Sequence, residues 1–374
     1  MRYKLGQLIE EYDEINDKGE FQDLESLQGI NSLKYFQECK SNKNDIDLYR
    51  YRICRKGMFA YNRATSRNGE KISIAYREGN DCLISPSYYC FKIVREDLLL
   101  ADYLMIWFKR PIFDKYARFH SWGSATEFFT FEDFCNTEIS LPSIEEQHKI
   151  VRNYKVITDR IELLKKIKKN LYFQSEIVFK NISSNELITI SSLIGIHEIP
   201  SGITKFANSK KYYATGDIDY DYKMSTYEII SYNERPSRAN MEPKINSLWF
   251  AKMQNTNKFL FFNEQSKDLN NVILSTGFMG IECKENIFYY LLSFVFTKNF
   301  NEQKDRFATG TTQVAINSDA LNKIMIPIPL ENKEKEYELL KNIFNNIQSI
   351  NEELGILFRL KELHLSTLSK TEVA

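Results

Sequence analysis

The 374-residue sequence lacks the cysteine and histidine patterns that build metal sites and disulfide frameworks. Its six cysteines include no Cys-x-x-Cys pair, and its four histidines form neither His-x-His nor His-Glu-x-x-His. Zinc sites usually need such closely spaced ligands, and disulfide frameworks belong to small chains that are dense in cysteine. We therefore predict reduced thiols and no metal site.

Long apolar runs are also missing. No stretch approaches the roughly 18 consecutive apolar residues that indicate a membrane-spanning helix. The first residues, Met1-Arg2-Tyr3-Lys4, do not form the apolar core of a secretory signal peptide. We therefore expect a cytoplasmic protein that does not associate with a membrane.

The sequence contains no catalytic motif that we recognise. An amino-methyltransferase would need an Asn/Asp-Pro-Pro-aromatic segment, but no two of the eight prolines are adjacent. The 14 glycines form no Gly-x-Gly, so the glycine-rich cofactor turn is absent, and there is no P-loop. We therefore predict no catalytic residues and no cofactor.

The charge balance is neutral, with 50 basic and 50 acidic residues. A protein that binds nucleic acid by charge alone would normally be basic. Two segments depart from this balance: residues 50–71 hold seven basic residues and one acid, and residues 235–258 hold five basic residues and one acid. Each segment is either solvated surface or a contact surface for an anionic partner.

An internal repeat organises the chain. Four segments recur in the same order at an offset of about 190 residues, which is far too long for a solenoid and indicates a duplicated domain. The matching segments are Tyr3–Ile9 with Ile188–Ile194, Phe59-Ala60 with Phe250-Ala251, Leu83–Ser85 with Ile273–Ser275, and Gly123–Pro142 with Gly310–Pro329. Short strands rich in β-branched and aromatic residues alternate with helical patches in each copy. The prediction is therefore a mixed α+β fold for each copy. Most aromatic residues, including Phe91, Phe128 and Phe250, are predicted to fill the cores.

A heptad-patterned helix follows each copy. Apolar positions alternate at spacings of four and three over residues 145–182 and again over residues 331–370. Helices of nearly 40 residues are about 55 Å long, and a small domain cannot cover such a stripe. We expect the two helices to pair as an antiparallel coiled coil with pseudo-two-fold symmetry between the halves.

Several segments together resemble the DNA-specificity (S) subunit of type I restriction-modification systems. They are Arg235–Met241, Leu248–Thr256, Leu274–Phe278, Thr309–Ile316 and the two junctions Ile139–Gln147 and Ile324–Pro329. The resemblance covers essentially the whole chain, because the order domain, helix, domain, helix is also that of the family. Two segments depart from the pattern. Trp122–Thr126 replaces the Gly-Thr-Thr-Gln form, and Glu331-Asn332-Lys333 lacks the Glu-Gln pair of the first junction.

The resemblance implies a division of the chain and a set of partners. Residues 1–143 and 184–330 would be target-recognition domains, with a central helix at 144–183 and a distal helix at 331–374. Each domain would read one half of a bipartite double-stranded DNA site. The helices would act as spacer and docking surface for two adenine methyltransferase subunits and, in a full system, two translocase-nuclease subunits. The chain itself would be non-catalytic.

Candidate DNA-binding residues follow the two equivalent strands and occupy the two glycine loops and the Arg235–Arg238 segment. Arg can bridge guanine, Asn and Gln can bridge adenine, and hydroxyls can bind phosphates. A polar, exposed turn is the alternative interpretation of each segment. For the whole chain, the alternative is an adaptor with two protein-binding domains on a coiled-coil spacer. The candidates are Asn62, Arg63, Ser66, Arg67, Trp122, Ser124, Thr126, Arg235, Ser237, Arg238, Lys252, Gln254, Asn255, Asn257, Thr309, Thr311, Thr312 and Gln313.

Overall fold

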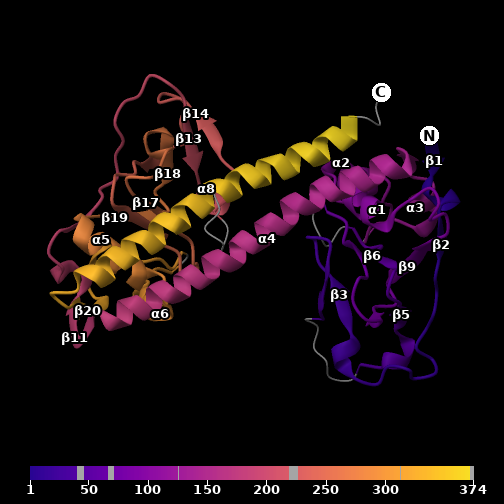
Figure 1. Ribbon diagram of the computed structural model, residues 1–374, viewed down its shortest axis with the longest axis horizontal. Helices are drawn as coiled ribbons and strands as arrows, with labels where there is room; N and C mark the ends of the chain where they lie inside the picture. The colour runs from indigo at the N-terminus through magenta and orange to yellow at the C-terminus, as the bar shows by residue number, and fades with distance from the viewer. Residues whose placement is uncertain (40–45, 66–70, 125, 219–225, 312, 371–374) are drawn as a thin grey trace. The chain divides into compact units, whose positions relative to one another are not determined.

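The computed structural model describes residues 1–39, 46–65, 71–124, 126–218, 226–311 and 313–370. The chain forms two compact units. Unit 1 consists of Met1–Thr158 together with the segment from Leu360, and unit 2 consists of Asp159–Arg359. Each unit therefore contains one globular α+β part and a segment of both long helices, which are α4 and α8 in Figure 1.

Unit 1 is built on an antiparallel four-stranded sheet in the order β2-β9-β6-β7. Its strands are β2 (Ile9–Glu11), β9 (Tyr88–Ile93), β6 (Phe59–Asn62) and β7 (Ile74–Tyr76). Two-stranded pairs surround it: β1 (Arg2–Lys4) with β10 (Glu138–Ser140), β3 (Gln28–Ile30) with β4 (Phe36–Glu38), and β5 (Arg52–Cys54) with β8 (Cys82–Ile84). The helices are α1 (Ala101–Phe108), α2 (Pro111–Phe119) and α3 (Phe131–Cys135).

Unit 2 repeats this plan. Its equivalent antiparallel sheet has the order β12-β19-β16-β17, formed by β12 (Ile196–Glu198), β19 (Phe278–Cys283), β16 (Ser247–Ala251) and β17 (Phe259–Phe262). A second sheet contains β14 (Glu228–Ile230), β13 (Lys210–Tyr213), β18 (Val272–Ser275) and β15 (Ala239–Met241), and β11 (Ser183–Thr189) pairs with β20 (Met325–Pro329). The helices are α5 (Glu285–Val295), α6 (Lys298–Phe307) and α7 (Ser318–Leu321).

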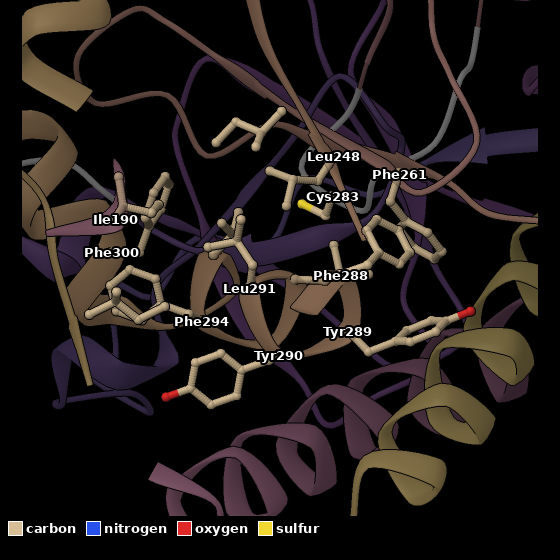
Figure 2. Packing of buried hydrophobic residues seen from close by; sticks show 14 of the residues in the cluster. Ile190, Leu248, Phe261, Cys283, Phe288, Tyr289, Tyr290, Leu291, Phe294 and Phe300 are labelled. Carbon is tan, nitrogen blue, oxygen red and sulfur yellow. The ribbon is translucent and has the colours of Figure 1, made fainter. Parts of the chain in front are cut away.

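The core of unit 2 lies between the β12-β19-β16-β17 sheet and α5, and α5 buries aromatic side chains along its length. Figure 2 shows Phe288 of α5 on the side of Leu248 and Phe261, and Phe294 of α5 on the side of Phe300 of α6. The polar tip of Tyr290 reaches the strand that leads into the second long helix, because its hydroxyl donates to Pro327 O at 2.7 Å. This hydrogen bond connects α5 to β20, the strand that precedes the second long helix.

The duplication predicted from the sequence is confirmed in the topology. The main four-stranded sheets correspond strand by strand, and α1, α2 and α3 correspond in order to α5, α6 and α7. The hydroxyl of Thr130 caps α3 by accepting from Asp133 N, and the amide oxygen of Asn317 caps α7 by accepting from Ala320 N. Strand β7 begins only at Ile74, because the N–H of Ile72 donates to Asp114 Oδ1 at 3.1 Å instead of to a neighbouring strand.

The two long helices are α4 (Ile144–Asn181) and α8 (Glu334–Lys370). The predicted seam positions are buried or half-buried, including the polar Lys168 and Ser175. Phe344 is also fully buried, although the heptad pattern did not include it. Gln147 holds the start of α4, since its side chain accepts from Leu100 N at 3.0 Å and donates to Leu98 O at 2.8 Å.

The helices pair antiparallel within each unit. In unit 2, Arg160 of α4 forms an ion pair with Glu353 of α8 at 2.7 Å, and Lys168 donates to Asn351 Oδ1 at 3.2 Å. In unit 1, the rings of Tyr154 and His364 lie 6.0 Å apart between centroids. Later residues of α4 thus meet earlier residues of α8, as the coiled-coil prediction requires. None of the described helices is both long and apolar enough to cross a membrane.

Candidate nucleic-acid interface

In unit 1, two loops at one end of the main sheet are held together by backbone hydrogen bonds. The first follows β6 at residues 63–65, and the second is the glycine loop at residues 122–128. Thr65 N donates to Glu127 O at 3.0 Å, and Phe129 N donates to Arg63 O at 2.8 Å. The glycine loop closes on itself, because Trp122 and Phe128 exchange two hydrogen bonds at 3.1 and 2.9 Å. We call this arrangement the loop pair.

Unit 2 contains the same loop pair at residues 252–254 and 309–315. Gln254 N donates to Val314 O at 2.9 Å, and Ile316 N donates to Lys252 O at 2.9 Å. Thr309 and Ala315 exchange two hydrogen bonds at 3.0 Å each. All of these bonds have counterparts in unit 1, including those of the departing Trp122–Thr126 segment. The departure in sequence therefore leaves these backbone hydrogen bonds in place.

The glycines of the two loops are required by the loops themselves. Gly123 has a φ of 148° and Gly310 a φ of 132°, a region that side-chain-bearing residues rarely adopt. A Cβ atom at Gly123 would lie 2.1 Å from Thr126 O, and one at Gly310 would lie 2.3 Å from Gln313 O. The glycines thus shape a tight turn in both units.

The candidate side chains of unit 1 surround its loop pair. Trp122 is 67% exposed, and its cross-strand neighbour Phe128 is 36% exposed. The guanidinium of Arg63 lies over the Phe128 ring at 5.2 Å, within cation–π range. Asn62 is half-buried and accepts from Ala64 N at 3.0 Å, so part of its hydrogen-bonding capacity serves the turn. The prediction that Phe128 fills the core is wrong, because its place in the glycine loop turns it outward.

Two further candidates of unit 1 are in the glycine loop. Ser124 is exposed and Thr126 is half-buried. Ser66 and Arg67 lie outside the described residues, as does Thr312 of unit 2.

The candidate side chains of unit 2 are predominantly polar. The side-chain amide of Gln254 donates to Asp305 O at 3.0 Å, and the backbone N–H of Asn255 donates to Asp305 Oδ1 at 3.0 Å. Lys252 is half-buried, while Asn257 is exposed. The glycine loop adds three exposed residues, which are Thr309, Thr311 and Gln313.

The Arg235–Arg238 segment is joined to this loop pair through a turn at residues 275–277. Thr276 N donates to Arg238 O, and Lys252 N donates to Gly277 O, each at 2.9 Å. Ser237 and Arg238 are exposed. Arg235 is engaged locally, since its guanidinium lies 4.3 Å over the Tyr232 ring and donates to Tyr232 O at 2.5 Å. Arg238 is therefore the arginine of this segment that presents its side chain to solvent.

Sequence reasoning did not identify the residues that support the loops from α2 and α6. In unit 1, Arg118 forms an ion pair with Glu127 of the glycine loop. In unit 2, the equivalent position is Asp305, which follows the fully buried Lys304. The repeat could not reveal these positions, because the charge at the equivalent residue is reversed between the two halves. Among the described residues, no three His, Cys, Asp or Glu side chains gather in a way that could hold a metal ion.

Comparison with known proteins places the chain in a family. A family model described as the type I restriction modification DNA specificity domain matches residues 13–172 and 185–356. No curated protein is significantly similar to the chain.

Two solved structures are similar to the chain over nearly its whole length. The S subunit of the type I restriction-modification system from M. genitalium has 12% sequence identity and a TM-score of 0.56, with 98% of this chain and 95% of that chain covered. The HsdS subunit from Thermoanaerobacter tengcongensis has 14% identity and a TM-score of 0.36, with 98% and 96% covered. Since the family model matches most of the chain, once in each half, the chain belongs to the family of type I restriction-modification DNA specificity proteins.

Proposed function

We propose that the chain is the non-catalytic subunit that reads a bipartite double-stranded DNA site, with unit 1 reading one half-site and unit 2 the other. The observation that supports this most strongly is the recurrence of one loop pair, with the same backbone hydrogen bonds, in both units. A rigid backbone that presents variable side chains suits sequence reading, because base contacts specify the site while backbone and hydroxyl contacts position the protein.

The proposed domains are residues 1–143 and 184–330 for recognition, with helices at 144–183 and 331–374 as spacer. The base-reading residues are proposed to be the candidates of the two loop pairs, including the half-buried Arg63 and Gln254, together with Ser237 and Arg238. Arg side chains would pair with guanine, and Asn or Gln side chains with adenine.

The helices are proposed to dock two adenine methyltransferase subunits and, where the host encodes them, two translocase-nuclease subunits. Both helices expose large apolar side chains, such as Phe173 at 65% and Leu363 at 62%. Exposed apolar surface of this kind supports a protein interface. Because the chain has no net charge, it gains little attraction to DNA on its own. Tight binding is therefore expected only with the methyltransferase subunits bound.

The decisive experiment co-expresses the chain with its candidate methyltransferase subunit, purifies the complex and maps methylated adenines across a host genome. A motif with two specified halves and an unspecified spacer is the expected result. Gel shifts over a series of salt concentrations separate this function from that of a protein adaptor, because phosphate neutralisation gives a steep salt slope. A complex that methylates without sequence preference, or a chain whose DNA binding is insensitive to salt, would contradict the proposal.

A further inference from the structure

We propose that Lys304 and Asp305 of α6 position the base-reading loop of unit 2, and that Gln254 thereby discriminates one A·T pair in the half-site. This inference rests on the proposed function and deepens it. Lys304 is fully buried, which is unusual for a lysine. Its ammonium donates to Met253 O at 3.1 Å and to Asp305 Oδ1 at 2.8 Å.

Asp305 accepts hydrogen bonds from the two residues that follow Met253. Its carboxylate accepts from Asn255 N at 3.0 Å, and its backbone carbonyl accepts from the side chain of Gln254 at 3.0 Å. Met253, Gln254 and Asn255 are thus each tied to the end of α6 by one hydrogen bond. A loop fixed at three consecutive residues loses little further freedom when it binds DNA.

Asn255 shows why the loop needs this support. Its φ is 57°, in the left-handed region that non-glycine residues seldom occupy. The hydrogen bond to Asp305 stabilises this conformation and turns the chain directly after Gln254. Without the carboxylate, the backbone would relax toward an ordinary conformation and the side chain of Gln254 would move with it.

The anchored amide of Gln254 retains what adenine recognition requires. One N–H is used by Asp305 O, which leaves a second N–H as donor and the amide oxygen as acceptor. A bidentate contact to adenine needs one donor for N7 and one acceptor for the N6 amino group. Lys304 and Asp305 are therefore positioning residues, while Gln254 makes the contact.

The described residues of unit 1 show no equivalent of the contacts made by Lys304 and Asp305. Ala117 and Arg118 occupy the equivalent positions in α2, and Arg118 pairs with Glu127 of the glycine loop. Loss of Lys304 should consequently affect the half-site of unit 2 alone.

The test uses the full chain in complex with its methyltransferase subunits and compares Lys304→Met with the matched control Gln303→Met. Gln303 is the preceding residue of α6 and also makes two tertiary hydrogen bonds. Its side chain donates to Met325 O at 2.9 Å and accepts from Met325 N at 2.8 Å, so it contacts β20 and not the base-reading loop. The readouts are thermal stability and the methylation motif, position by position. The half-site of unit 2 is identified as the one that loses specificity in Gln254→Ala.

In Lys304→Met we expect discrimination at one A·T pair of that half-site to fall about tenfold, with the other half-site unchanged. Gln303→Met should lower stability to a similar extent and leave the motif intact. The positioning role is overturned if Lys304→Met keeps the wild-type motif, or if both variants degrade both half-sites equally.

A second pair of variants covers the case in which Lys304→Met does not fold. Asp305→Asn keeps an oxygen acceptor for Asn255 N, so it should read DNA like the wild type, whereas Asp305→Ala should show the relaxed motif. Equal motifs in these two variants would overturn the inference. A wild-type complex without a bipartite motif would instead overturn the proposed function, and the inference with it.

Discussion

The two loop pairs share their backbone and differ in almost every side chain. Unit 1 presents Trp122 and Phe128, with the Arg63 guanidinium over the Phe128 ring. Unit 2 presents Thr309 and Ala315 at the equivalent positions and holds Gln254 against α6. One surface is thus aromatic, and the other is polar.

The difference teaches how one fold can serve two sequences. Backbone hydrogen bonds and a glycine with positive φ define the loop in both units, and neither depends on the neighbouring side chains. Side chains can therefore be exchanged without rebuilding the frame. Under the proposed function, unit 1 would read its half-site through apolar and cationic contacts, and unit 2 through hydrogen bonds.

The strongest test of this equivalence removes the glycines. Gly123→Ala and Gly310→Ala would each place a Cβ within 2.3 Å of a carbonyl oxygen of the same loop. Relieving the clash and the positive φ should cost roughly 3 kcal/mol, so methylation of the bipartite motif should fall by about 100-fold in each variant. Methylation assays on the purified complex measure this loss.

Controls for the glycine variants come from the same units. Gly29 and Gly216 have open space where a Cβ would be placed, and Gly29→Ala and Gly216→Ala should methylate normally. If Gly310→Ala lost activity while Gly123→Ala kept it, the two loop pairs would not be functionally equivalent.

The next test separates the two half-sites. Arg63→Ala should weaken recognition of one half-site, and Gln254→Ala or Asn255→Ala should weaken recognition of the other. Each loss is expected to be about 1–3 kcal/mol. Arg63→Ala and Gln254→Ala each remove one base-specific contact, whereas Asn255→Ala also strains a backbone with a φ of 57°. Methylome sequencing shows which half of the motif becomes degenerate. Degeneracy in the same half for Arg63→Ala and Gln254→Ala would refute the assignment of one half-site to each unit.

A smaller effect should distinguish the aromatic surface from the polar one. Trp122→Ala removes an exposed indole and is expected to weaken DNA binding by about 1 kcal/mol without changing the salt slope, since no phosphate contact by a cation is lost. Thr309→Ala, at the equivalent position of unit 2, should have a smaller effect. Fluorescence anisotropy over a salt series measures both quantities. A slope that changes in Trp122→Ala would show that the indole also orients a cationic contact.

The smallest predicted effect concerns the helix contacts of the two units. Burial lowers the pKa of His364 in unit 1, so the unfolded state binds a proton more readily than the folded state. The folded state keeps its full stability above the pKa of the unfolded histidine, which is near 6.5. It loses stability as the pH falls below that value and His364 must take up a proton. In unit 2, the hydrogen bond from Arg160 lowers the pKa of Glu353. The carboxylate therefore stays charged, and its ion pair with Arg160 persists, over the pH range in which His364 takes up a proton.

Hydrogen exchange at pH 7.5 and 5.5 checks this contrast. Protection factors, which are corrected for the intrinsic slowing of amide exchange in acid, should fall at the lower pH for residues 150–158 and 360–368. Those near Arg160 and Glu353 should change little. His364→Leu should abolish the pH dependence in unit 1. An equal loss of protection in both units would locate the pH sensitivity elsewhere.

Much of the fold could be predicted from local patterns. The repeat located the equivalent strands, and the heptad spacing identified seam positions as unusual as Lys168 and Ser175, both of which are buried. Heptad periodicity is a property of neighbouring residues on one helix, so it can be recognised without knowing the partner. Gln147 illustrates the limit. Its place in the junction was recognised, but its hydrogen bonds to Leu98 and Leu100 depend on how α1 packs.

The candidate interface could be predicted only in part. The glycine loops and the segments after β6 and β16 were recognised by their residue types, but their pairing was not. Hydrogen bonds such as Thr65 N to Glu127 O join residues far apart in the chain, and no periodic pattern encodes them. Phe128 was assigned to the core because aromatic residues are usually buried, whereas the loop turns it outward.

The sequence by itself determined the duplication, the α+β class of each copy, the two long helices and the family, since each depends on spacing or on the order of short segments. Only the tertiary structure decided which side chains share a surface and what supports them. Lys304 and Asp305 are the clearest case, because their role depends on α6 ending beside the loop that follows β16. Local patterns specify secondary structure, but the placement of one segment against another follows from packing that the whole unit provides.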